Sequence, residues 1–306
     1  MNRTRIALAL VASAAMLAVA SCGSGSDPLA SGGSTKAASA GTIVVGSANF
    51  PENALLAEIY AGALSAKGIT VEKKLNIGSR ETYIPALKDG SIDLIPEYTG
   101  ALDQYFNKDA KATGADDVYA ELKAAVPATL TILDKSAAED KNALVVTKET
   151  ADKYNLKTIA DLQPIAKDLT LGGPPEMKTR LTGVPGLKRV YNLDFKTFRP
   201  LDASGPLSVQ ALKNGQVDVA NIFTTDPSIA ENGFVVLGDP KGLFVAQNVV
   251  PLITKSKVND TIAAALNAIS AKLDTATLGA LVKEVVVDKL DPAVVAKEFL
   301  TKNGLG

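Results

Sequence analysis

Two aromatic residues, Tyr98 and Phe223, occupy the same position in two copies of one sequence pattern. Residues 86–94 (ALKDGSIDL) recur 125 positions later as residues 211–219 (ALKNGQVDV). Each copy predicts a helix, a glycine turn and a short strand, and the aromatic residue stands where the strand ends. Ligands of open α/β sheets bind just outside the carboxyl ends of the strands. The repetition therefore predicts two similar lobes, each of which brings one aromatic side chain to a ligand held between them.

Histidine and cysteine, two residue types that often carry catalysis, are absent or nearly so. The sequence has no histidine, and its single cysteine is Cys22. These absences exclude a Ser-His-Asp triad and the usual zinc sites, and they remove the usual general base near neutral pH. Asp93 and Asp218 could act as paired carboxylates in acid–base chemistry. Because they recur at equivalent positions of the two copies, we expect them to be structural, and we predict no catalytic residue, metal or cofactor.

The first 22 residues have the pattern of a bacterial lipoprotein signal. A basic start precedes an apolar run over residues 6–20, which is too short to span a bilayer, and Cys22 closes the segment. Cys22 is the expected lipidation site, and the alternative is an ordinary secretory signal with an incidental cysteine. Residues 23–41 are rich in Gly, Ser and Ala and predict a flexible tether. We therefore expect a lipid-anchored protein on the outer face of the cytoplasmic membrane.

The rest of the chain predicts an α/β fold in two lobes. The net charge is −1 and no basic stretch is interleaved with aromatic residues, so nucleic acid is not an expected partner. Strands and helices alternate from residue 42 to residue 95, as in a parallel sheet with right-handed crossovers. The C-terminal helices have nothing to cover in the second lobe, so the chain should cross back near Ala246, which gives two hinge strands. The expected division is lobe 1 at 42–145 and 246–306, and lobe 2 at 146–245.

Three stretches carry a resemblance to a known family. They are GSANFPE at 46–52, PEYTG at 96–100 and FTTD at 223–226. Together they resemble the substrate-binding proteins of osmoprotectant ABC importers, the glycine betaine/choline/carnitine-binding (ProX/OpuAC-like) family, over essentially the whole body from Thr42. The resemblance implies a type II periplasmic-binding-protein clamshell. Such a protein, expected here as a monomer, closes on a small solute and delivers it to an ABC permease in the membrane.

The resemblance also assigns roles to individual residues. A quaternary ammonium has no N–H to donate, so it is held over the faces of aromatic rings. Tyr98 and Phe223 fall on positions of the family's aromatic cage, and Arg180 falls on its carboxylate-binding arginine. The alternatives are packing in the core for the two rings and a solvated helix face for Arg180. The remaining residues expected to line the cleft are Asn49, Phe50 and Thr99.

Other positions depart from the family pattern. Gln247 and Asn142 stand where members often have tyrosine, and Ala48 stands where several carry lysine. Two rings and two amides make a weaker cation cage and a better site for hydroxyls or amides. The sequence therefore predicts a solute that is more polar than glycine betaine, or weakly bound. Glu52 and Glu97 are expected to make structural hydrogen bonds.

Two other functions remain open from the sequence. One is an extracytoplasmic enzyme on the same fold, which would need two carboxylates with separated pKa values in the cleft. The other is a non-transporting lipoprotein that binds a protein or a lipid. The solute receptor is the preferred reading because no acidic pair is evident at the predicted cleft.

Overall fold

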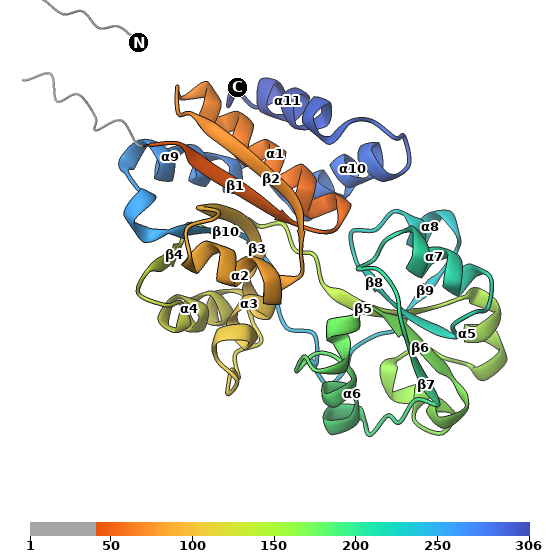
Figure 1. Cartoon of the computed structure of the whole chain (residues 1–306). Helices are drawn as coiled ribbons and strands as arrows, with labels where there is room; N and C mark the ends of the chain where they lie inside the picture. The colour runs from red at the N-terminus through yellow and green to blue at the C-terminus, as the bar shows by residue number, and fades with distance from the viewer. Residues whose placement is uncertain (1–40) are drawn as a thin grey trace, which may run out of the picture. The chain divides into compact units, whose positions relative to one another are not determined.

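The computed structural model describes residues 41–306, which belong to one compact unit. The predicted signal, nearly all of the predicted tether and the lipidation site at Cys22 lie outside the described residues. Within residues 41–306, no helix has both the length and the apolar composition needed to cross a bilayer. The described chain builds two five-stranded sheets, each of which carries its own helices (Figure 1).

The first sheet has the strand order β2-β1-β3-β10-β4. Its strands are β1 (Ile43–Ala48), β2 (Val71–Gly78), β3 (Leu94–Tyr98), β4 (Leu130–Ile132) and β10 (Val249–Thr254). β1 pairs in parallel with β2 and β3, whereas β10 is antiparallel to β3 and β4. β10, although it comes late in the chain, therefore lies inside a sheet whose other strands precede residue 133.

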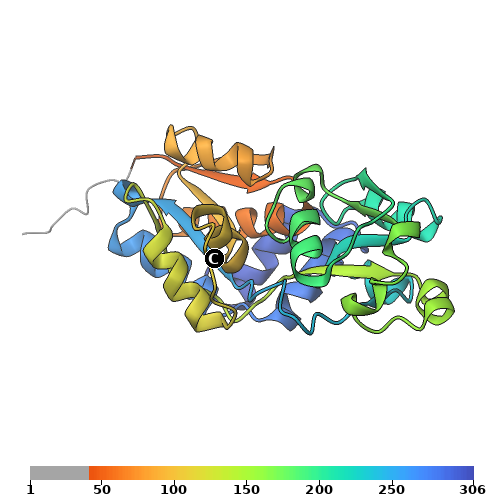
Figure 2. The same cartoon turned by 90° about the horizontal axis from the view of Figure 1, so that it is seen from below.

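Helices cover both faces of the first sheet. On one face α1 (Pro51–Ala66) packs against α9 (Asp260–Ser270), α10 (Thr275–Val286) and α11 (Pro292–Lys302). On the other lie α2 (Arg80–Lys88), α3 (Thr99–Phe106) and α4 (Ala115–Ala125). Figures 1 and 2 show the C-terminal helices, in blue, beside the orange α1. The C-terminal helices therefore pack on the first sheet, through α1, and not on the second.

The second sheet has the order β7-β6-β8-β5-β9. Its strands are β5 (Asn142–Val146), β6 (Thr170–Gly173), β7 (Thr197–Pro200), β8 (Val219–Phe223) and β9 (Val235–Val236). The helices are α5 (Lys148–Tyr154) and α6 (Val184–Tyr191) on one face, and α7 (Pro206–Lys213) and α8 (Ser228–Glu231) on the other. Short 3₁₀ helices are η1 (Ile159–Leu162), η2 (Ala166–Asp168), η3 (Pro175–Lys178) and η4 (Lys255–Lys257).

The two copies of the repeat fold alike, as α2–β3 and α7–β8. Gly90 and Gly215 make the turns with φ of +80° and +65°, which glycine adopts without steric penalty. The carboxylate of Asp93 accepts a backbone N–H of β1 at 2.9 Å, and that of Asp218 accepts one of β6 at 2.7 Å. Both aspartates therefore join neighbouring strands, which is a structural role, as expected of them.

Ser79 and Ser204, which stand 125 positions apart like the rest of the repeat and were expected to cap the two helices, do not cap them. Ser79 stands at the N-cap of α2, but its hydroxyl donates to Glu81 (2.7 Å) and makes no cap bond. Ser204 precedes the N-cap of α7 and accepts the backbone N–H of Phe223 at 2.8 Å. The first turn of α7 is capped by the carboxylate of Asp202, which accepts three backbone N–H groups. This acceptor leaves Ser204 free to support the end of β8.

The chain passes between the sheets after β4 and again before β10. The two passages pair through an antiparallel bridge between Glu139 and Asn248, and the N–H of Asp140 donates to the carbonyl of Gln247 at 3.1 Å. β5, which begins at Asn142, already lies in the second sheet. The lobe boundaries at 145/146 and 245/246 stay predictions, and the first falls inside β5.

Candidate functional site

Three aromatic rings meet where strands of the two sheets end. Phe50 is the N-cap of α1, two residues after the end of β1, while Tyr98 ends β3 and Phe223 ends β8. The ring centroid of Phe50 is 6.0 Å from that of Tyr98 and 5.2 Å from that of Phe223. Phe50 therefore connects the two aromatic residues of the repeat. Hydrogen bonding of the Phe223 backbone to Ser204 fixes the end of β8 in this position.

A cavity of about 70 Å³, here called the aromatic cavity, opens beside these rings. It is lined by seven of the eight residues that the sequence analysis assigned to ligand binding, namely Asn49, Phe50, Tyr98, Asn142, Arg180, Phe223 and Gln247. The residues come from both sheets and from the second crossing. Distant parts of the sequence thus converge on one small space.

The eighth residue, Thr99, lies elsewhere. It is fully buried, and its hydroxyl donates to the carbonyl of Ala246 at 3.3 Å and accepts the N–H of Asn248 at 3.0 Å. Its own N–H donates to the carbonyl of Asn248. Thr99 therefore links the start of α3 to the second crossing, and it does not line the aromatic cavity.

The two amides that replace expected tyrosines are held differently. Gln247 is 1 % exposed, and its Oε1 accepts the N–H of Ala101 at 2.9 Å. Its Nε2 has no hydrogen-bond partner within the described part of the chain. Asn142 pairs with Phe223 across the β5–β8 ladder, which sets it next to that ring. A buried amide N–H without a partner destabilises the folded protein until a ligand or a water molecule supplies an acceptor.

Two acidic side chains lie at the same junction, although the sequence showed no acidic pair at the predicted cleft. Glu52, in the first turn of α1, accepts hydrogen bonds from the hydroxyls of Tyr98 (2.7 Å) and Thr225 (2.6 Å). Asp140, in the first crossing, lines the aromatic cavity and accepts the N–H of Thr225 at 3.2 Å. Burial raises the pKa of both carboxyls, and the charge of Glu52 raises that of Asp140 further. Glu52 makes the structural hydrogen bonds that were expected of it.

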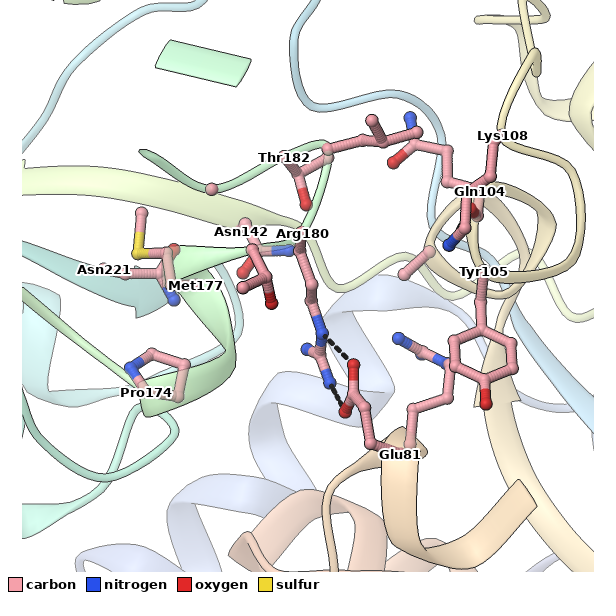
Figure 3. A pocket seen from close by; sticks show the side chains of 15 residues that line it. Glu81, Gln104, Tyr105, Lys108, Asn142, Pro174, Met177, Arg180, Thr182 and Asn221 are labelled. Carbon is pink, nitrogen blue, oxygen red and sulfur yellow. Dashed lines mark hydrogen bonds and ion pairs between the residues drawn. The ribbon is translucent and has the colours of Figure 1, made fainter. Parts of the chain in front are cut away.

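Arg180 bridges the two sheets. It lies between η3 and α6, and its Nε and Nη2 donate to the two carboxylate oxygens of Glu81 on α2, at 3.1 and 2.7 Å (Figure 3). Glu176 is a second, looser partner at 3.5 Å. Burial opposes ionisation of Glu81, but hydrogen bonds from Arg180 and Ser79 lower its pKa to about 2. Arg180 is therefore not a solvated helix residue but part of a contact between the sheets.

A larger cavity of about 330 Å³, here called the polar cavity, adjoins the aromatic one and shares five lining residues with it, namely Arg80, Ala101, Asn142, Pro174 and Arg180. Figure 3 shows Gln104, Tyr105 and Lys108 on one side of it, and Pro174, Met177 and Asn221 on the other. Asn221 is 1 % exposed, and neither atom of its amide group has a partner among residues 41–306. Arg80 is bound by Glu97 at 2.8 and 2.6 Å, so Glu97 has the structural role expected of it.

Sequence reasoning missed Asp140, Glu81 and Asn221. Asn221 could have been found, because it precedes Phe223 by two residues and side chains at i and i+2 share one face of a strand. Asp140 offered only its nearness to Asn142. Nothing in the spacing of Glu81 and Arg180, 99 residues apart, indicates that they meet. Across the part of the chain that the structure describes, no acidic cluster is arranged to hold a metal ion.

Comparisons with known proteins agree with this architecture. Residues 41–302 match the OpuAC family, described as the substrate binding domain of an ABC-type glycine betaine transport system. The glycine betaine-binding protein YehZ of Escherichia coli is 26% identical over 279 residues, which cover 87% of this chain and 92% of YehZ. A crystal structure of a glycine betaine/carnitine/choline ABC transporter protein superimposes with a TM-score of 0.67 at 26% identity, covering 86% of this chain and 99% of that one. The predicted clamshell fold class is thereby confirmed.

A third relative is a longer protein. The ergothioneine transport permease/ergothioneine binding protein EgtU of Helicobacter pylori is 27% identical over 266 residues, which cover 86% of this chain. The chain spans about half of that relative's length, 48%.

Proposed function

Because the chain belongs to the OpuAC family of substrate-binding domains of ABC-type glycine betaine transport systems, we propose that it holds the quaternary ammonium group of a small solute at Phe50, Tyr98 and Phe223. The observation that carries this proposal is the meeting of three rings from three separate segments beside one cavity. Each ring face contributes about 0.5–2 kcal/mol to the binding of a cation, and more where water is excluded. Asp140 adds a carboxylate beside the rings.

Binding between two lobes also explains how a partner would recognise the solute-bound protein. A ligand that contacts both sheets favours the arrangement in which they are close, and the two crossings can act as the hinge. The partner is an ABC permease in the cytoplasmic membrane. The protein acts as a monomer, anchored on the outer face of that membrane through lipidated Cys22, and it binds its solute without chemical change.

The test is titration calorimetry of the purified protein with glycine betaine, choline and carnitine. At least one should bind, and Phe50→Ala and Phe223→Ala should each weaken binding roughly 2- to 30-fold, the loss of one ring contact. Tyr154→Ala, at an exposed ring on α5, is the control and should leave affinity unchanged. Unchanged affinity in both ring variants, or turnover of the solute, would contradict the proposal.

A further inference from the structure

The polar and aromatic cavities contain few cationic groups that a ligand could use. Three cationic residues line them, namely Arg80, Lys108 and Arg180. Arg80 is buried and bound through two nitrogens to Glu97. Lys108 lines only the polar cavity, where its exposed ammonium donates to the carbonyl of Gln104 and lies 5.3 Å from the ring centroid of Tyr105. Of these three residues, only Arg180 both lines the aromatic cavity and has a partner that a ligand's carboxylate could replace.

Glu81 already holds Arg180 in the way that a ligand's carboxylate would. Two nearly parallel hydrogen bonds join the guanidinium to both carboxylate oxygens, the strongest arrangement that arginine offers to a carboxylate. The hydroxyl of Ser79 donates to Glu81 Oε2 at 2.7 Å and fixes the carboxylate in this position. A solute carboxylate that binds the same edge of the guanidinium must displace Glu81, and one that binds the other edge would lie close to the Glu81 carboxylate.

The remaining ionisable groups along the two cavities are acidic. Asp140 lines the aromatic cavity beside the rings, and within the described residues no basic side chain forms an ion pair with it. Glu176 lines the same cavity and is the second partner of Arg180. A cationic solute gains from Glu176 and favours the ionised form of Asp140, whereas a zwitterion brings a further negative charge to a place where the arginine is already neutralised. Discrimination of this kind works through the repulsion of the wrong ligand.

We propose that Glu81 is a specificity-determining residue, which neutralises Arg180 and directs the site toward quaternary ammonium alcohols in preference to zwitterionic betaines. This inference rests on the proposed function, since it concerns the same site. It assigns to Arg180 a role other than the binding of a solute carboxylate. It also names a residue, Glu81, that can be changed without touching the aromatic rings.

Choline and glycine betaine provide the test because both carry a trimethylammonium group and differ in a hydroxyl against a carboxylate. The dissociation constants of both are measured by titration calorimetry on the full protein and on Glu81→Gln, which keeps the size of the side chain and removes its charge. The wild-type protein should bind choline more tightly. Glu81→Gln should shift the ratio of the two constants toward glycine betaine by about tenfold or more, because Arg180 becomes available.

Glu58→Gln is the matched control. Glu58 also binds a cation through both carboxylate oxygens, Lys73 at 2.9 and 2.8 Å, but it lies on α1 away from both cavities. This variant should keep the wild-type ratio. Tighter binding of glycine betaine by the wild-type protein, or an unchanged ratio in Glu81→Gln, overturns the inference and leaves the proposed function standing. Failure of every quaternary ammonium to bind overturns both.

Discussion

The hydroxyl of Thr225 donates a hydrogen bond of 2.6 Å to the carboxylate of Glu52, although 173 positions separate them in the chain. Glu52 begins α1 on the first sheet, and Thr225 follows β8 of the second. The same carboxylate accepts the hydroxyl of Tyr98, one of the three rings. One buried acid therefore links the aromatic cluster to the contact between the sheets.

Replacement of Thr225 by valine tests this link. The variant keeps the shape of the side chain but removes a donor from a buried carboxylate, so the free energy of unfolding should fall by about 1–3 kcal/mol. Urea titration followed by circular dichroism measures it. Thr301→Val is the control, because its hydroxyl is exposed and donates only to a carbonyl of its own helix. A change within about 0.5 kcal/mol is expected there. Equal effects of the two changes would show that the bond to Glu52 adds no stability.

Asp103 should make stability depend on pH. It is 2 % exposed, and burial together with the charge of Glu121 raises its pKa from 3.8 to about 7. Between these values the folded protein keeps a proton that the unfolded chain releases, so this residue lowers stability as pH rises from about 4 to 7. In Asp103→Asn that decline should be smaller, as measured by urea unfolding at several pH values. The same pH dependence in variant and wild type would refute the prediction.

Solute binding should release a proton from Asp140. Burial and the charge of Glu52 raise the pKa of Asp140, and a bound cation beside it favours the ionised carboxylate. Affinity for a quaternary ammonium should therefore increase with pH until Asp140 is ionised in the free protein. Calorimetric enthalpies should differ between buffers of different ionisation heat, and Asp140→Asn should reduce that difference. Enthalpies that are identical in all buffers would contradict proton release.

A side chain at Gly100 should destabilise the protein, because the second crossing lies close to this residue. A Cβ there would lie 2.4 Å from Val245 Cγ2 and 2.5 Å from the carbonyl oxygen of Ala246, in the second crossing. Gly100→Ala should lower the free energy of unfolding by about 1–3 kcal/mol, since the crossing must shift. Gly279→Ala is the opposite control, because nothing lies within 4 Å of its Cβ position in α10. There alanine should stabilise by about 0.5–1 kcal/mol.

The repeat made much of the fold predictable. Because Asp93 and Asp218 stand at equivalent points of one pattern, a structural role for both followed from the sequence, and so did the positions of Tyr98 and Phe223 at strand ends. The helix caps were less accessible. Asp202 caps the first turn of α7 in place of Ser204. Local sequence does not decide between two such acceptors when both lie close to the start of the helix.

The site was predictable residue by residue only where a strand end or a family motif marked it. The partner of Arg180 could not be predicted, because the contact with Glu81 depends on how two separately folded sheets meet. The fate of Thr99 was hidden for the same reason. It adjoins Tyr98 in sequence, yet its hydrogen bonds go to the second crossing, whose path the sequence indicated only to within a few residues.

The order of the strands has a consequence for the synthesis of the chain. All strands of the second sheet lie between residues 142 and 236, whereas the first sheet needs β10, and its core needs α9, α10 and α11. When the ribosome has made residue 245, one sheet has all of its strands and the other lacks β10, which lies between β3 and β4. The lobe whose sequence begins first is therefore completed last, and until then α1 exposes the apolar face that α11 later covers.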